Sequence, residues 1–374
     1  MEKTCDMLIK SFKTYLYILF LVLDYSLGKK KIYFHGREKS FCKKLINHIS
    51  WLLRNETFNN NYYAFGLNLK NKKQKAYIGS SEFLNIKNRA EKLMRRTMGA
   101  SDLSYEVITK DKFVTHGYIS GNDIPCVPVE GMVSWQGINM NGETKPLEAL
   151  YDFEDDLVLK NILMESGNGF MLCKPLKSGH LLVNREICGL SDFIKLLEKG
   201  RWVLQKRFKS HRVIREVNDT ALNSTRIVTI FNGKYPVYLG GFQSFATQGG
   251  EIDSWDKGSI YVGIDPYNSA LKGQGFFHPA IKGKSLVSEH PDSKIKFDGL
   301  HIPYLKEARE LCLRAHKIFY NHFIIGWDVA ITDDGPKIIE ANEKPGMNAV
   351  QCLDGGLRNI VKETFTNLKR ELDE

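Results

Sequence analysis

Apolar positions along the chain follow two different periods, and each period predicts one kind of element. Segments in which apolar residues recur at helical spacing are 40–54, 85–98, 191–199 and 303–320. Short apolar or β-branched runs that end at turn residues are 170–174, 180–184, 202–205, 226–231 and 235–239. Because hairpins and amphipathic helices occur together, the pattern predicts a layered α+β or α/β fold.

The clearest pattern is a hairpin over 323–342. It consists of an apolar, β-branched run, a turn at Asp333-Asp334-Gly335 and a second strand. A turn at this place puts Asp328 directly opposite Glu340. Because side chains alternate along a strand, Glu340 and Asn342 share one face.

Two carboxylates that face each other across strands need an explanation. At a separation of about 4 Å they repel by roughly 4 kcal/mol at an effective dielectric near 20, and such pairs are normally avoided. A bound cation resolves the conflict, and oxygen ligands from Asp328, Glu340 and Asn342 suit Mg²⁺ rather than zinc. The alternative is an ordinary surface hairpin with two independent acids.

The positive charge of the chain is concentrated in its N-terminal third. The 374 residues, enough for two or three domains, carry a formal charge of +10. Residues 1–112 hold 22 Lys and Arg against 10 Asp and Glu, so the remainder is slightly acidic. Such a surface suits an anionic lipid or an acidic saccharide, or it is simply solvated. Nucleic acid ranks last because no binding motif for it is present.

Residues 15–23 form an apolar run that is too short to span a bilayer. No small-residue cleavage site follows it, so a secretory signal is disfavoured. We expect a buried helix, or an interfacial helix over residues 14–27 that contacts the inner face of the membrane. The seven cysteines include no Cys-x-x-Cys pair, which indicates a reducing, cytoplasmic setting rather than a disulfide or zinc framework.

Two polar residues end apolar strands in the middle of the chain. Lys174 precedes a Lys-Ser-Gly turn, and its ammonium group could point into a cleft while its stem packs. Gln205 precedes Lys206-Arg207-Phe208, where backbone and amide groups at a strand end suit an adenine edge. Taken alone, each residue is better explained as a solvated strand end.

The order of these features resembles that of ATP-grasp enzymes: a strand lysine, a glutamine hinge, an arginine strand and Asp…Glu-x-Asn on a late hairpin. More closely, the chain resembles the sugar-transfer-associated ATP-grasp family over roughly residues 110–353. The stretches that carry the resemblance are 204–211, 222–229, 252–259, 290–293, 302–303, 326–330, 340–342 and Pro345-Gly346.

This resemblance implies a fold and a division into domains. Two α+β subdomains would clasp ATP, the smaller over residues 109–206 and the larger, with the Mg²⁺ site, over 207–374. A basic N-terminal domain, residues 1–108, would precede them.

The resemblance also implies roles for individual residues. Lys174 matches the lysine that holds the phosphates of ATP, and Lys112 matches one that contacts the α-phosphate. Gln205, Lys206 and Phe208 match the adenine hinge. His211 lies where the ribose would be met.

Arg226 matches an arginine suited to the transferred phosphoryl group or a developing oxyanion, while Asp328, Glu340 and Asn342 match the Mg²⁺ ligands. Ser224, Ser254 and Ser259 depart from the family pattern, and the last two put substrate binding at their loop in doubt. No role follows for the motif His290-Pro291-Asp292.

The function implied is that of an ATP-dependent carboxylate–amine ligase. An acid would attack the γ-phosphate to give an acyl phosphate, and an amine would displace phosphate to form an amide. The resemblance implies a role in bacterial capsular polysaccharide, exopolysaccharide or glycoconjugate synthesis. A sugar or small-molecule kinase on the same fold is the second hypothesis. A non-catalytic nucleotide-binding scaffold protein is the third.

Overall fold

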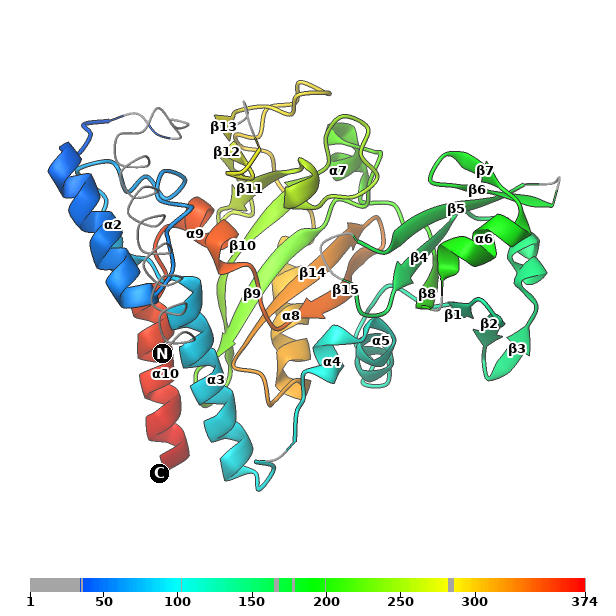
Figure 1. The fold of residues 1–374 in the computed structure, drawn as a ribbon, viewed down its shortest axis with the longest axis horizontal. Helices are drawn as coiled ribbons and strands as arrows, with labels where there is room; N and C mark the ends of the chain where they lie inside the picture. Colours follow the sequence, from blue (N-terminus) through cyan, green and yellow to red (C-terminus); the bar gives the residue numbers. More distant parts are fainter. Residues whose placement is uncertain are drawn as a thin grey trace, which may run out of the picture.

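The computed structural model describes residues 34, 36–101, 103–164, 168–176, 179–198, 200–281 and 286–373. The expected helix at 14–27 and the residues Lys177 and Ser178 of the predicted turn lie outside this part. Two antiparallel sheets dominate the structure, a smaller unit on the right and a larger one in the centre of Figure 1. Among the described residues, no helix is both long and apolar enough to cross a membrane.

The smaller unit is built on an eight-stranded sheet in the order β3-β2-β1-β8-β4-β5-β6-β7. Its strands are β1 Gly131–Ser134, β2 Gly137–Met140, β3 Glu143–Lys145, β4 Leu157–Asn161, β5 Phe170–Leu176, β6 His180–Val183, β7 Glu186–Cys188 and β8 Arg201–Lys206. Helix α6, Leu190–Leu197, covers one face and buries Phe193 and Leu197 completely. The opposite face of β4, β5 and β8 turns toward the larger unit.

The larger unit holds a seven-stranded sheet in the order β13-β12-β11-β10-β9-β14-β15. Its strands are β9 Thr225–Phe231, β10 Pro236–Phe245, β11 Ile260–Ile264, β12 Leu271–Phe277, β13 Leu286–Val287, β14 Ile324–Thr332 and β15 Gly335–Asn342. Helix α8, Leu305–Ile318, lies on one face, where Ile227 and Trp327 join its apolar stripe in a single core. The predicted helix at 303–320 is therefore confirmed.

Helices from both the N-terminal and the C-terminal part of the chain cover part of the other face of this sheet. Helices α2 (Phe41–Asn55), α3 (Ser80–Thr97) and α10 (Arg358–Asp373) lie side by side at the left of Figure 1. Apolar residues of α3 and α10 share one core with Val228 and Ile230 of β9. The same face of β9 carries Arg226 at the strand's beginning, because alternate residues share a face. The helices thus leave this end of the sheet open.

Short helices complete the fold. They are α4 Val107–Lys110, α5 Lys112–Ser120, α7 Arg212–Val217 and α9 Met347–Asp354, with 3₁₀ turns at Gln74–Ala76, Leu147–Asp152 and Trp255–Lys257. Helix α5 begins cleanly because the Asp111 carboxylate accepts hydrogen bonds from the backbone N–H groups of Phe113 and Val114. This cap fixes Lys112 at the first position of the helix, beside β4.

Candidate active site

A cavity of about 510 Å³ separates the two sheets. Strands β4, β5 and β8 form one wall, and β9, β10, β11, β14 and β15 form the other. The volume is in the range of small-molecule and cofactor sites. The sequence-predicted residues that line it are Lys112, Gln205, Lys206, Phe208, Arg226, Asp328, Glu340 and Asn342.

One register row of the large sheet carries the charged wall of the cavity. Glu340 on β15 pairs with Asp328 on β14, as predicted, and a register shift lies between Asp328 and Val329. Asp328 in turn pairs with Arg226 on β9, and Arg226 pairs with Phe242 on β10. Because neighbouring strands lie about 4.8 Å apart, the four side chains form a continuous row across the sheet.

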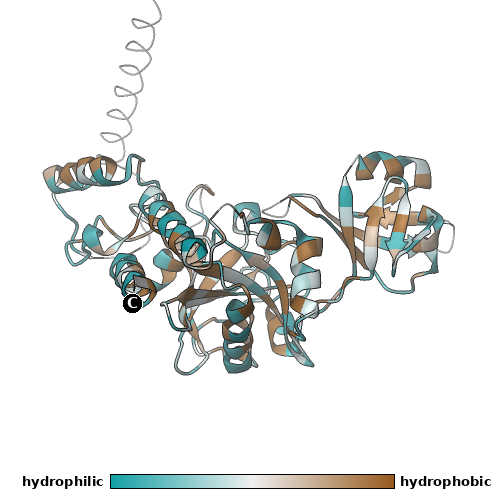
Figure 2. Ribbon diagram, turned by 90° about the horizontal axis from the view of Figure 1, so that it is seen from below, coloured by the Kyte–Doolittle hydropathy of each residue, from teal (hydrophilic) through white to brown (hydrophobic). Residues whose placement is uncertain are grey.

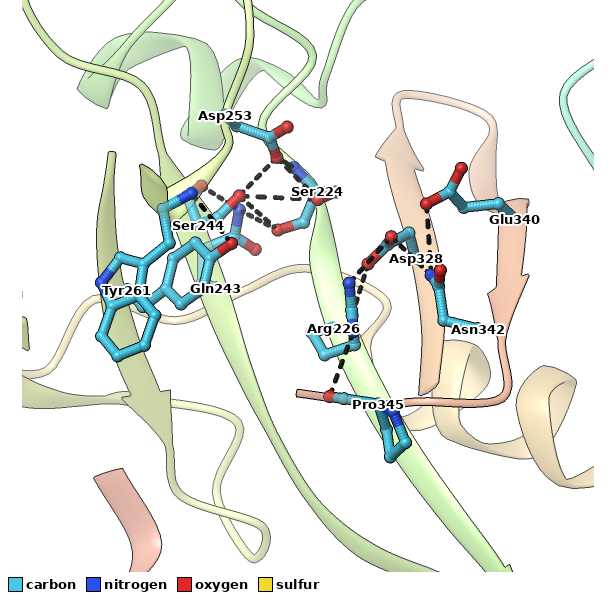
Figure 3. A network of polar contacts seen from close by, with 11 residues as sticks. Ser224, Arg226, Gln243, Ser244, Asp253, Tyr261, Asp328, Glu340, Asn342 and Pro345 are labelled. Carbon is cyan, nitrogen blue, oxygen red and sulfur yellow. Dashed lines mark hydrogen bonds and ion pairs between the residues drawn. The ribbon is translucent and has the colours of Figure 1, made fainter. Parts of the chain in front are cut away.

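Hydrogen bonds fix the geometry of this row (Figure 3). Arg226 donates through Nε to Oδ1 of Asp328 at 2.6 Å and through Nη2 to Oδ2 at 3.0 Å. Its Nη1 donates to the carbonyl of Pro345 at 3.1 Å. A bidentate, largely buried pair of this kind has little freedom to rotate, so Arg226 is held in position before any ligand binds.

The charges of the row are strongly coupled. Burial and the neighbouring Glu340 raise the pKa of Asp328 to about 7, against the pull of Arg226. Burial also opposes ionisation of Glu340, but the positive charges of Lys112 and Lys160 hold the pKa of Glu340 below its ordinary value. Burial lowers the pKa of Lys160 against the attraction of Glu340. Acidic and basic groups thus face each other across the cavity.

The hairpin residues fit a magnesium ion in their chemistry. Asn342 Nδ2 donates to Asp328 Oδ2 at 3.1 Å and to Glu340 Oε1 at 3.2 Å, so one polar atom already bridges both carboxylates. Turned over, the same amide would present its oxygen. The carboxylate oxygens of Asp328 have more lone pairs than Arg226 uses, so Asp328 can accept from Arg226 and also bind a magnesium ion. Within the described ranges, no group of three His, Cys, Asp or Glu residues forms a metal site, and here the third ligand would be an amide.

The opposite end of the cavity suits an adenine ring. Val158, Phe170 and Leu172 supply apolar walls next to Gln205. The amide nitrogen of Gln205 lies 3.5 Å from the Val127 carbonyl and 3.4 Å from that of Pro128. Gln205 thus lines the cavity with its amide nitrogen directed toward these two carbonyl groups. Lys112 donates to the carbonyl of Met164 at 2.6 Å.

Two predicted nucleotide residues are not brought to the cavity. Lys174 lies farther along β5 than Phe170 and Leu172, where its side chain is exposed to solvent. His211 instead caps α7, with Nδ1 accepting from the backbone N–H of Val213 at 3.2 Å. Neither residue lines the cavity, because each lies a few residues beyond the last lining residue of its segment, Leu172 for Lys174 and Phe208 for His211.

Sequence reasoning missed Lys160, which lines the cavity from the centre of the small sheet. Lys160 ends the apolar run of β4, and Asn168 and Gly169 follow it at the cavity. Lys160 is followed by Asn161-Ile162-Leu163 rather than by a turn like the Lys-Ser-Gly turn that singled out Lys174, so no local signal selected it. Only the sheet order shows which lysine faces the charged row.

The motif His290-Pro291-Asp292 has a structural place. His290 is fully buried and donates through Nε2 to the carbonyl of Ala246 at 2.8 Å. Asp292 accepts from the backbone N–H of Gln248 at 2.7 Å. The motif therefore holds the chain that leaves β10.

Two α+β units that close over a cavity, with lysines on one wall and an Asp–Glu–Asn set on the other, define an ATP-grasp protein. The sequence model for sugar-transfer associated ATP-grasp proteins matches residues 101–365. The chain therefore belongs to the sugar-transfer associated ATP-grasp family, and the expected ATP-grasp fold is confirmed.

Solved structures with a similar fold are distant in sequence. D-alanine–D-alanine ligase from Bacillus anthracis is 16% identical, with 71% of this chain and 69% of that chain covered and a TM-score of 0.39. The D-alanine–D-alanine ligase from Coxiella burnetii is 11% identical, with 71% of this chain and 60% of that chain covered and a TM-score of 0.40. N5-carboxyaminoimidazole ribonucleotide synthetase from Thermotoga maritima is 14% identical, with 71% of this chain and 49% of that chain covered and a TM-score of 0.36. No curated protein sequence matches the chain.

Proposed function

We propose that this protein is an ADP-forming carboxylate–amine ligase that acts in bacterial surface-polysaccharide or glycoconjugate synthesis. The observation that carries the proposal is the row Glu340, Asp328 and Arg226, which faces Lys160 across a cavity large enough for a nucleotide and a substrate. The family description supports the sugar context.

In this proposal the chain's own residues bind and orient the reactants. The segment Gln205–Phe208 meets adenine, and Lys112 and Lys160 neutralise the phosphates. Asp328, Glu340 and Asn342 would hold Mg²⁺, which when bound neutralises charge on the phosphate oxygens. Arg226, fixed by Asp328, lies where it can stabilise the transferred phosphoryl group.

The bond changes in the reaction balance without an added redox partner. A substrate carboxylate oxygen attacks the γ-phosphorus, and the bond between that phosphorus and the bridging oxygen breaks to release ADP. An amine nitrogen then attacks the acyl carbon, the bond from carbon to the phosphate oxygen breaks, and the amine loses a proton. No side-chain nucleophile is needed.

An assay of ADP release tests this proposal. The purified full chain is incubated with ATP, Mg²⁺ and panels of sugar acids and primary amines. We expect ADP release to require an acid, hydroxylamine to trap the acyl phosphate, and the product mass to equal acid plus amine minus water. ADP release with a hydroxyl acceptor alone, and a product that gains phosphate, would instead identify a kinase. A complete lack of ADP release would favour a scaffold protein.

A further inference from the structure

Asp253 lies on the wall of the cavity one step away from Arg226. Ser224 directly precedes β9 and shares a face with Arg226, because two residues along a strand return to the same side, about 7 Å apart. The carboxylate of Asp253 accepts a hydrogen bond from the Ser224 hydroxyl, so Asp253 lies beside the charged row of Arg226, Asp328 and Glu340 rather than within that row (Figure 3).

One oxygen of Asp253 takes all the hydrogen bonds that this carboxylate receives. Oδ2 accepts from the backbone N–H and the hydroxyl of Ser224, each at 2.6 Å, and from the hydroxyl of Ser244. Among the described residues, Oδ1 has no hydrogen bond, and Asp253 forms no ion pair. A lining carboxylate that is fixed at one oxygen and open at the other is suited to bind a cationic group.

Aromatic rings continue the wall next to Asp253. Tyr261 stacks on Phe242 with ring centroids 4.2 Å apart, and Trp255 stacks on Tyr261 at 5.1 Å. The backbone N–H of Trp255 donates to the Tyr261 hydroxyl at 3.2 Å. Aromatic faces attract cations and pack against the apolar faces of rings, so this wall adds to the preference of Asp253 for a positively charged ligand.

We propose that Asp253 and the wall of Trp255, Tyr261 and Phe242 form the subsite for the amine substrate, and that this substrate is a primary amine bound as its ammonium ion. The ammonium ion gives one proton to the open oxygen of Asp253, which frees the nitrogen lone pair for attack on the acyl carbon. The inference rests on the proposed ligase function. The acid is kept out of this subsite by the charge of Asp253 and is attracted instead to Arg226. Because Ser224, which holds Asp253, and Arg226 lie on one face of the sheet, the acid and the amine would bind next to each other.

Calorimetric titration tests this subsite without requiring turnover. Glucosamine, ethanolamine and glycine are titrated into the full chain saturated with Mg²⁺ and ADP. We expect at least one of these amines to bind, and Asp253→Asn to weaken that binding about 10- to 100-fold. N-acetylglucosamine should not bind. Asp334→Asn removes the same charge from an exposed turn outside the cavity and should bind the amine like the original protein.

The outcomes separate this inference from the ligase proposal. Equal amine affinity in Asp253→Asn and the original protein, or no binding of any amine, would overturn the amine subsite. Unchanged ADP affinity in Asp253→Asn shows that the variant is folded. Amine binding that depends on Asp253, together with no acid-dependent ADP release, would leave the subsite standing and overturn the ligase.

Helix α2 independently presents an apolar stripe on its exposed face. Cys42, Ile46, Ile49 and Leu53 are spaced four, three and four residues apart, so they lie on one side. Ile46 is 62% exposed and Leu53 is 80% exposed, while the polar residue His48 is buried. Trp51 packs inward, but the outward stripe is apolar where the exposed face of a surface helix is ordinarily polar. The helix lies at the outer edge of the molecule (Figures 1 and 2).

We further infer that this stripe docks on an anionic lipid surface. Lys43 lies next to the stripe and is exposed. Residues 1–112 have an excess of 12 positive charges, and the sequence before α2 contains the apolar run 15–23 and Lys29-Lys30-Lys31. Basic residues near an anionic membrane strengthen binding through electrostatic attraction. This charge favours lipid over a second copy of the chain, which would repel it.

Vesicle sedimentation tests the docking surface. We expect the full chain to sediment with phosphatidylglycerol–phosphatidylcholine vesicles and not with pure phosphatidylcholine. The double variant Ile46→Ser, Leu53→Ser should bind on the order of 100-fold more weakly, whereas Leu196→Ser, an exposed apolar residue elsewhere, should bind normally. Vesicle binding that the double variant retains, or self-association that it abolishes, would overturn this inference.

Discussion

Replacing Asp328 with Asn is expected to reduce ADP release roughly 1000-fold, equivalent to about 4 kcal/mol of transition-state stabilisation. The substitution keeps the shape of the side chain but removes one charge from the metal set and from the pair with Arg226. The rate is measured at several Mg²⁺ concentrations. We also expect Mg²⁺ with ADP to raise the melting temperature of the original protein and not that of the variant.

Loss of the ion pair leaves Arg226 largely buried with a weaker partner, so Asp328→Asn also lowers stability. Circular dichroism shows whether the variant folds. Glu340→Gln provides a second variant that keeps the Arg226 pair and should also need more Mg²⁺. Asp334→Asn, on the same hairpin but in its exposed turn, should have normal activity. Full activity of Asp328→Asn would contradict the metal assignment.

The hairpin is the part of the site that the sequence predicted best. The structure pairs Asp328 with Glu340 as predicted, but the turn alone, which pairs Thr332 with Gly335, would set Asp328 opposite Ile339. A register shift between Asp328 and Val329 brings Glu340 opposite Asp328 instead. The placement of Asn342 on the same face as Glu340 follows from the alternation of side chains along the strand. Such a prediction succeeds because all the determining contacts lie within 20 residues of one another.

Contacts between distant segments could not be predicted in this way. Lys87 on α3 is buried and pairs with Glu91 at 2.8 Å and with Glu343 at 3.3 Å. Glu343 directly follows Asn342, so an N-terminal helix is tied to the end of the candidate metal set. Asp253 is a similar case, since its position depends on the pairing of β9 with β10. No local periodicity contains this information.

The sequence predicted Lys174 and did not single out Lys160 for the same reason. Both lysines lie in short apolar strands, and local sequence does not show which of them lines the cavity. Their strands are neighbours, but only Lys160 lies level with the cavity. The electrostatic coupling of Lys160 to Glu340 is a property of two facing sheets, and it becomes visible only when both are in place.

Replacing Lys160 with Met is expected to lower ADP release by about 100- to 1000-fold, the effect of removing one preorganised group that stabilises developing charge. Met has a similar length and packs well, so the loss reflects charge rather than volume. The Michaelis constant for ATP should rise as well, because Lys160 would neutralise phosphate in the ground state too. Steady-state kinetics with varied ATP measure both quantities.

Lys174→Met is the matched control, since it makes the same change on the adjacent strand. With its side chain exposed and outside the cavity, Lys174 should tolerate the substitution with activity within about twofold of the original, as solvated surface sites generally do. The reverse result, an inactive Lys174→Met and an active Lys160→Met, would show that Lys174 is the lysine that binds the phosphates, as the family pattern implies. The pair of variants thus decides between the family pattern read from sequence and the position of each lysine in the fold.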